Sequence, residues 1–175
     1  MSEKFVHIKE LLDLETSKKV KARASFSSGK QSLDDYIQRY AKNGSKNQVG
    51  QTHLLIEEEP LKIIGYYTLS TLSVEKSLLA KFTSYPAPEI SGMLMARLAI
   101  ATSEQRKGHG KKLLVHALTK IQRISEDAAV KIVVVDALDQ QAKDYYIQFG
   151  FIEFDNEPMK LFISIETVNS VLSQV

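Results

Sequence analysis

The chain has 175 residues, of which 43% are hydrophobic and 25% are charged, and its net charge at pH 7 is +2. This length and composition are typical of one soluble globular domain, so we expect residues 1–175 to form a single domain. The absence of cysteine excludes disulfides, a thiol nucleophile and thiolate metal sites. No apolar run approaches membrane-spanning length and the first residues do not resemble a signal peptide, so the expected location is the cytoplasm.

Positive charge is concentrated in two parts of the chain. Residues 1–50 hold ten Lys and Arg against six Asp and Glu, and residues 81–131 hold nine against four. Such segments either contact phosphates or keep the protein in solution, and both interpretations stay open at this point.

The first third of the chain predicts a strand, a connector, a helix and a loop. Short apolar runs indicate a strand over residues 5–12, and the charged residues 18–23 indicate a solvated connector. A helix is expected to begin near Ser32, because apolar residues follow it at helical spacing. The polar segment 42–51 contains two glycines and predicts a loop.

The middle of the chain predicts a hairpin and a βαβ unit. Residues 53–57 and 63–74 are rich in β-branched and aromatic residues, which favours two antiparallel strands. The apolar run 93–101 predicts a buried strand, apolar residues at helical spacing after Gly110 predict a helix, and residues 131–135 predict a second buried strand. A strand, a helix and a strand in this order favour a parallel, right-handed crossover.

The last part predicts a short helix over residues 139–148 closed by Gly150, then strands over 151–154 and 161–165, and a terminal helix. The expected fold class is therefore α/β (α+β), a mixed and mainly antiparallel central sheet with a βαβ core and flanking helices.

Two glycines lie between the strand 93–101 and the helix after it. The loop reads Gln105, Arg106, Lys107, Gly108, His109, Gly110. Backbone N–H groups at a helix N-terminus bind anions, and Arg106, Lys107, Lys111 and Lys112 would add charge for phosphates. The loop matches neither a P-loop nor the three-glycine dinucleotide motif, which disfavours ATP and NAD. A simple tight turn is the alternative interpretation.

These residues resemble a known superfamily. Arg97-Leu98-Ala99-Ile100, residues 105–110 and Leu113-Leu114 together resemble the cofactor motif of the GNAT N-acetyltransferases, Gln/Arg-x-x-Gly-x-Gly/Ala. Asp139, Ala142, Tyr145, Tyr146 and Phe149-Gly150-Phe151 resemble the later helix and strand of that superfamily. Phe26-Ser27-Ser28-Gly29, Leu33-Asp34-x-Tyr36-Ile37 and Val135-Asp136-Ala137 resemble its TacT/AtaT-like branch, the toxins of type II toxin–antitoxin systems.

The resemblance implies a GNAT-like fold that binds acetyl-CoA as the acetyl donor, without a metal. The residues that it implies in cofactor binding are Leu98, Ala99, Ile100, Gln105, Arg106, Lys107, Gly108, His109, Gly110, Lys111, Asp139, Ala142 and Tyr145. It implies that the backbone N–H of Ile100 stabilises the thioester oxygen and that Tyr146 is the general acid for the departing thiolate. Packing on a helix face is the alternative for Tyr145, Tyr146 and Phe149.

The toxin branch implies an acceptor and partners. The acceptor would be the amino group of aminoacyl-tRNA, whose acetylation blocks translation, and the partners a ribbon-helix-helix antitoxin and a second copy of the chain. A small amine, a peptide N-terminus or a protein lysine stay open as acceptors, as does an acetyl-CoA-binding module without transfer. The sequence assigns no general base to His53, His109 or His116, and Arg97 is expected to pair with a carboxylate or to reach solvent.

Overall fold

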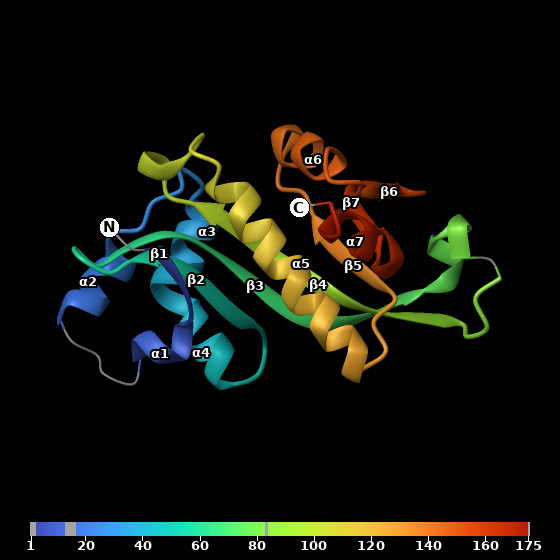
Figure 1. Cartoon of the computed structure of the whole chain (residues 1–175), viewed down its shortest axis with the longest axis horizontal. Helices are drawn as coiled ribbons and strands as arrows, with labels where there is room; N and C mark the ends of the chain where they lie inside the picture. Colours follow the sequence, from blue (N-terminus) through green and yellow to red (C-terminus); the bar gives the residue numbers. More distant parts are fainter. Residues whose placement is uncertain (1–2, 13–16, 83, 175) are drawn as a thin grey trace. The chain divides into compact units, whose positions relative to one another are not determined.

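The computed structural model describes residues 3–12, 17–82 and 84–174 (Figure 1). The chain divides into two compact units. Unit 1 comprises Met1–Ser70 and Arg97–Val115, and unit 2 comprises Thr71–Ala96 and His116–Val175. Strands β3 (Lys62–Glu75) and β4 (Glu89–Ile100) and helix α5 (His109–Asp127) pass through both units. The single domain expected from the sequence stays a prediction.

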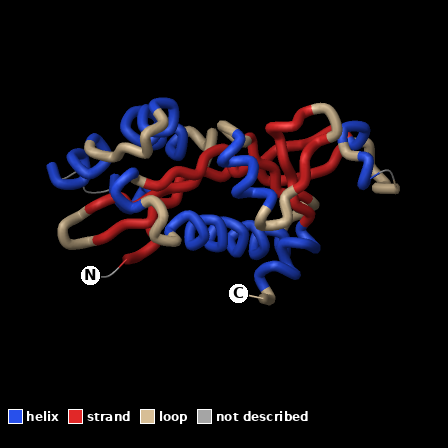
Figure 2. The backbone as a smooth tube through the Cα atoms, turned by 90° about the horizontal axis from the view of Figure 1, so that it is seen from above, coloured by secondary structure: helices blue, strands red, loops and turns tan. Residues whose placement is uncertain are grey.

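Unit 1 combines strands with a group of short helices. Its further elements are β1 (Glu3–His7), α1 (Ile8–Leu12), α2 (Ser17–Ala24), α3 (Gln31–Asp35), the π-helix η1 (Tyr36–Tyr40), α4 (Ala41–Lys46), β2 (Gln51–Glu57) and the 3-10 turn η4 (Thr102–Glu104). Strand β2 pairs antiparallel with β1 and with β3. In Figure 2 the helices of residues 17–46 and the start of α5 lie on opposite sides of these strands.

The core of unit 1 lies between the strands and the helices α1, α3, η1 and α4. Ile8 and Ile37 from the helices and Leu54 and Tyr66 from the strands are completely buried in one apolar cluster. Ala99 and Ala101 belong to the same cluster. The end of β4, which leads into the glycine loop, is therefore fixed by the main core of this unit.

Unit 2 contains the parallel pair of strands. Its further elements are η2 (Lys76–Leu78), η3 (Ala80–Phe82), β5 (Ile132–Asp136), α6 (Gln140–Ile147), β6 (Ile152–Phe154), β7 (Glu157–Ser164) and α7 (Ile165–Leu172). Strand β5 pairs parallel with β4 and antiparallel with β7, and β6 pairs antiparallel with β7. With β3 and β4 shared by both units, the strand order is β1-β2-β3-β4-β5-β7-β6. The predicted mixed, mainly antiparallel sheet with a βαβ core is confirmed.

Three local predictions are wrong. The first strand ends at His7, and residues 8–12 form α1, because Ile8 and Leu11 turn into the helical core. The expected connector 18–23 is the helix α2, which buries Ala22. The expected loop 42–51 is helical as far as Lys46, because Ala41 and Ser45 are completely buried and this packing outweighs the low helix propensity of Asn43 and Gly44.

Two features are absent from residues 3–12, 17–82 and 84–174. None of the helices in these ranges is long and apolar enough to cross a membrane. Among the same residues, no group of three His, Asp or Glu side chains is placed to hold a metal ion.

Candidate functional site

The glycine loop begins where β4 comes very close to β3. A Cβ atom at Gly65 of β3 would lie 2.6 Å from the carbonyl oxygen of Ala99 and 2.6 Å from Cδ1 of Leu113. Only a residue without a side chain permits this approach. The backbone N–H of Ala101 then donates to the carbonyl oxygen of Ile64 at 2.9 Å. Sequence reasoning missed Gly65, although a glycine inside a β-branched strand is the signal for such an approach.

The loop is fixed to the segment of residues 26–30. The Gln105 side-chain amide donates to the carbonyl oxygens of Ser28 at 2.9 Å and Ile100 at 3.1 Å. Thr102 donates to the carbonyl oxygen of Ser27 through its backbone N–H at 2.8 Å and its hydroxyl at 3.2 Å. The side chain of Gln105 therefore orients the loop, because it joins the end of β4 to the segment beside it.

A buried carboxylate holds that segment in turn. Asp34 is 7% exposed and accepts hydrogen bonds from the Ser28 N–H at 2.7 Å, the Ser28 hydroxyl at 2.6 Å and the Ser27 hydroxyl at 3.2 Å. Hydrogen bonds to a charged acceptor are stronger than those between neutral groups. Asp34 thus supports the loop indirectly, through Ser27 and Ser28.

The loop backbone has the geometry of an anion-binding turn. Arg106 and Gly108 have positive φ angles of 61° and 84°. Helix α5 begins at His109, and the N–H of Lys112 donates to the carbonyl oxygen of Gly108 at 3.2 Å. The N–H groups of the turn before Lys112 have no acceptor within the helix, and a helix N-terminus of this kind attracts anions.

Carboxylates of unit 1 already neutralise two of the four cations near the loop. Glu104 forms ion pairs with Lys62 and, at 3.0 Å, with Lys107. Hydrogen bonds from Lys62 and then Lys107 lower the pKa of Glu104 to about 2. Lys112 pairs with Glu3 at 2.7 Å and holds the pKa of that carboxyl below its usual range.

Two cations remain for a ligand. Arg106 and Lys111 are exposed, and neither pairs with a carboxylate among the residues that the structure describes. The role of four cations in binding phosphates stays a prediction, with Lys107 paired to Glu104 and Lys112 to Glu3. Glu104 itself was missed because its partner Lys62 is distant in sequence.

The side chain of His109 points inward. It is 6% exposed, with Nε2 3.5 Å from Glu104 and Nδ1 3.8 Å from Glu3. His109 can therefore offer its backbone N–H to an anion, whereas its ring belongs to the carboxylate cluster beneath the loop.

The parallel pairing of β4 with β5 is short. It runs from Gly92 with Ile132 to Leu94 with Val134, while β4 continues to Ile100. Peptide groups alternate in direction along a strand, and the N–H of Ala101 points to β3. The N–H of Ile100 therefore points away from β3.

The remaining predicted site residues lie in unit 2, on and beside α6. Asp139 caps this helix by accepting a hydrogen bond from the Ala142 N–H at 2.9 Å. Gly150 follows the helix end with a φ of 87°, a conformation that favours glycine. Asp139 and Ala142 thus place the helix that carries the two tyrosines.

Tyr145 and Tyr146 are phenols in an apolar environment. Tyr146 is 7% exposed, and its ring centroid lies 5.4 Å from that of Phe151 and 5.6 Å from that of Tyr145. Burial, and secondarily Tyr145, raises the pKa of Tyr146, and burial raises the pKa of Tyr145 to about 12. The Tyr145 hydroxyl is buried without a hydrogen-bond partner among the described residues. Both phenols hold their protons at neutral pH, as a general acid must.

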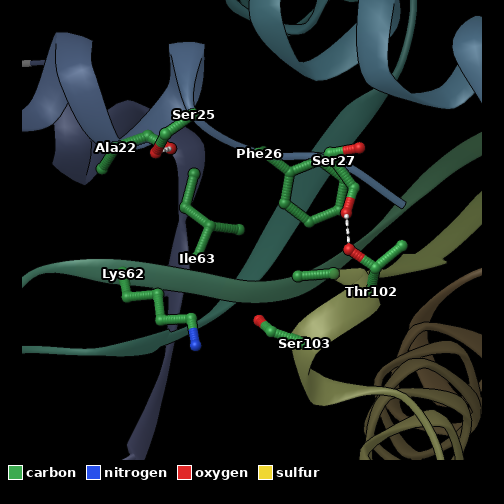
Figure 3. A pocket seen from close by; sticks show the side chains of 9 residues that line it. Ala22, Ser25, Phe26, Ser27, Lys62, Ile63, Thr102 and Ser103 are labelled. Atoms are coloured by element: carbon green, nitrogen blue, oxygen red, sulfur yellow. Dashed lines mark hydrogen bonds between the residues drawn. The ribbon is translucent and has the colours of Figure 1, made fainter. Parts of the chain in front are cut away.

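A small open cavity of about 120 Å³ lies beside the start of the loop (Figure 3). It is lined by Ala22, Ser25, Phe26, Ser27, Lys62, Ile63, Ala101, Thr102 and Ser103. Lys62 is paired with Glu104, and Thr102 is bonded to Ser27. Since these lining groups already have protein partners, the cavity points to no particular ligand.

Comparison with known proteins identifies the family. Residues 22–165 match the family model described as an acetyltransferase (GNAT) domain. The chain is 26% identical over 149 residues to a tRNA-acetylating toxin of Mycobacterium tuberculosis, which covers 85% of this chain and 89% of that protein.

Solved structures have the same fold. A Tyr-to-Phe mutant of the toxin AtaT, bound to the C-terminus of the antitoxin AtaR and to acetyl-CoA, superimposes with a TM-score of 0.82 at 21% identity and covers 99% of this chain and 100% of that one. AtaT complexed with acetyl-methionyl-tRNAfMet gives a TM-score of 0.84 at 20% identity and covers 97% and 99%. The predicted resemblance is confirmed, and the chain belongs to the GNAT acetyltransferase domain family.

Proposed function

We propose that this protein is an acetyl-CoA-dependent N-acetyltransferase of the cytoplasm that acetylates the amino group of aminoacyl-tRNA and thereby blocks translation. The observation that carries the proposal is the glycine loop. In a chain of the GNAT family, it combines the N-terminus of α5 with two cations that have no carboxylate partner in the described ranges. The similarity to toxins that act on tRNA supports the choice of acceptor.

The donor site follows from the loop. The N–H groups of His109, Gly110 and Lys111 bind the pyrophosphate of acetyl-CoA, with the side chains of Arg106, Lys107 and Lys111 beside them. Gln105 and Gly108 set the path of the backbone.

The pantetheine arm runs along the end of β4. The backbone of Leu98 and Ala99 binds this arm, and the N–H of Ile100 points to the thioester oxygen. Its direction away from β3 supports this role, and one such donor is typically worth about 3 kcal/mol of transition-state stabilisation.

The acetyl transfer needs one acid. The neutral amine attacks the thioester carbon, a C–N bond forms, the C–S bond breaks, and the departing thiolate takes the proton of the Tyr146 hydroxyl. Solvent then returns a proton to Tyr146 and removes the extra proton of the amine. An α-amino group has a pKa of about 8 and a lysine amine one of about 10.4, so more of the α-amine is neutral at physiological pH. A site without an assigned base therefore favours an α-amino acceptor.

Asp139, Ala142 and Tyr145 are the further proposed site residues, and they lie in unit 2. Asp139 and Ala142 fix the start of α6, and Tyr145 packs against Tyr146. A ribbon-helix-helix antitoxin and a second copy of the chain are the proposed partners. The complex of AtaT with its antitoxin AtaR supports the first of these.

A transfer assay tests the proposal. The purified protein is incubated with labelled acetyl-CoA and either methionyl-tRNA or uncharged tRNA, and the label on the aminoacyl group is measured. We expect label only with charged tRNA. Label on small amines or protein lysines but not on charged tRNA would indicate a different acceptor, and acetyl-CoA binding without any transfer would indicate a binding module.

A further inference from the structure

Arg97 of β4 presents an unpaired cation on an aromatic platform. Its guanidinium carbon lies 3.9 Å from the centroid of the Tyr36 ring. The side chain is partly exposed, and none of its N–H groups has a hydrogen-bond acceptor in the described ranges. Of the two sequence-based expectations for Arg97, a carboxylate partner or access to solvent, the structure agrees with the second, and the guanidinium also lies over a ring.

The platform beneath Arg97 is rigid. The Tyr36 hydroxyl bonds to the Thr52 hydroxyl at 3.1 Å, which bonds in turn to Thr68 at 3.0 Å. The Tyr36 ring stacks on Tyr66 with centroids 5.9 Å apart. Because Tyr36 is held at both its ring and its hydroxyl, the ring that the guanidinium contacts has a fixed position.

A guanidinium in this state is suited to an oxyanion. Stacking occupies one face of the group and leaves the N–H donors at its edge, which match the two oxygens of a phosphate. A role in packing alone does not need donors that are left unpaired.

The position of Arg97 along β4 limits which phosphate it can bind. Arg97 lies three residues before Ile100, a distance of about 10 Å along a strand. In an aminoacyl-tRNA the reacting amine is separated by about eight covalent bonds from the phosphorus that joins the last two nucleotides, which extend to roughly 10 Å. The backbone span and the extended length of this acceptor end are therefore similar.

We propose that Arg97 binds the phosphodiester between the last two nucleotides of the aminoacyl-tRNA acceptor and so positions the amine opposite Ile100. This inference rests on the proposed function. It assigns the recognition of the acceptor end to the Arg97–Tyr36 pair, separately from the loop cations that bind the donor.

The test uses substrates with and without that phosphate. The acetylation of methionyl-tRNA, of a methionylated CCA trinucleotide and of methionyl-adenosine is measured with the full-length protein. For Arg97→Met we expect KM to rise on the order of tenfold to a hundredfold for the first two substrates, with no change for methionyl-adenosine or for acetyl-CoA. Arg97→Lys should have an intermediate effect, because it keeps the charge and loses the planar donors.

Arg39→Met is the matched control. Arg39 is exposed and pairs with Asp35, so its replacement removes the same charge without touching the platform. The inference would be overturned if Arg39→Met raised KM as much as Arg97→Met does. It would also be overturned if Arg97→Met raised the KM for methionyl-adenosine as much as that for the longer substrates.

A neutral methylphosphonate at the last linkage sharpens the test. In the wild type the methylphosphonate should raise KM by the same factor as Arg97→Met does. In the Arg97→Met variant it should cause no further rise in KM. Additive losses would refute the contact. If Arg97→Met does not fold, Arg97→Lys takes its place in the same cycle. If the wild type acetylates none of the charged substrates, the proposed function fails, whereas wild-type activity without any effect at Arg97 overturns this inference alone.

Discussion

The glycine loop of unit 1 and the tyrosine helix of unit 2 are held in place by opposite means. Residues 101–112 are fixed by backbone hydrogen bonds and ion pairs around Glu104, Gln105 and Asp34. Residues 139–151 are fixed by a helix cap and by aromatic packing around Tyr146. The first region offers charge and oriented N–H groups to an anion, whereas the second keeps a phenol protonated in an apolar environment.

The difference predicts separate failures. A change in the loop network should alter the affinity for acetyl-CoA and the stability of the fold, and should leave the proton transfer intact. A change at the tyrosines should alter the chemical step and leave the affinity for acetyl-CoA intact.

The largest expected effect is that of Tyr146→Phe. The variant removes the proposed acid and keeps the ring that packs on Phe151, so kcat should fall by about a hundredfold to ten-thousandfold with the KM for acetyl-CoA unchanged. Steady-state kinetics on charged tRNA measure both. Tyr145→Phe is the matched control and should keep kcat, because it removes a hydroxyl without a partner in the described ranges. A larger loss for Tyr145→Phe would transfer the role of the acid to Tyr145.

Asp34→Ala should have the next largest effect. It removes the acceptor for three hydrogen bonds to Ser27 and Ser28, so the free energy of unfolding should fall by about 3 kcal/mol, as measured in urea. The KM for acetyl-CoA should rise, because Ser28 positions Gln105. Asp35→Asn is the control, since Oδ1 of Asp35 accepts no hydrogen bond among the described residues and its ion pair at 3.6 Å is with the exposed Arg39, which contributes little to stability. Equal destabilisation by both variants would contradict the role of the Asp34 network.

Gly108→Ala isolates the backbone of the loop. A Cβ atom at Gly108 meets nothing within 4 Å, so the cost arises only from the φ of 84°. We expect the free energy of unfolding to fall by about 1 kcal/mol and the KM for acetyl-CoA to rise. Gly44→Ala in α4 is the control and should be neutral or stabilising, because Gly44 is helical and has room for the methyl group. An unchanged KM for acetyl-CoA in Gly108→Ala would show that the backbone conformation at this position is not needed to bind the donor.

The smallest expected effect is a dependence of stability on acid pH. The folded pKa of Glu104 is lowered to about 2 by Lys62 and Lys107. A lowered carboxyl pKa stabilises the fold above the unfolded value of 4.5, and this contribution is lost as the pH falls through the folded value. The two pKa values of Glu104 span roughly the interval from pH 5 to pH 2. Over this interval the melting temperature should therefore fall less steeply for Glu104→Gln than for the wild type. Parallel curves would contradict the ion-pair cluster.

The sequence predicts those parts of the site that depend on neighbouring residues. The spacing of Gly108 and Gly110 before an amphipathic helix predicts the loop, and Asp139 and Gly150 predict both ends of α6. Their φ angles and caps are local properties. The assignment of individual residues to the binding of acetyl-CoA, and of Tyr146 to the acid, stays a prediction.

The supports of the loop could not be predicted in this way. Glu104 is paired with Lys62, and position 65 requires glycine because the Ala99 carbonyl oxygen lies too close for a Cβ atom. Both roles appear only when segments distant in the sequence meet. The helix α4 is similar, since buried Ser45 bonds to the Gly50 carbonyl and tertiary packing overrides local propensity.

The buried phenols also give the protein a built-in spectroscopic reporter. The chain has seven tyrosines and no tryptophan, so tyrosine dominates its near-ultraviolet absorption. Burial raises the pKa of Tyr66, Tyr67, Tyr145 and Tyr146, so these rings ionise at a lower pH once the structure around them opens than they do in the folded protein. An alkaline absorbance titration therefore reports the unfolding of both units without any added dye or label.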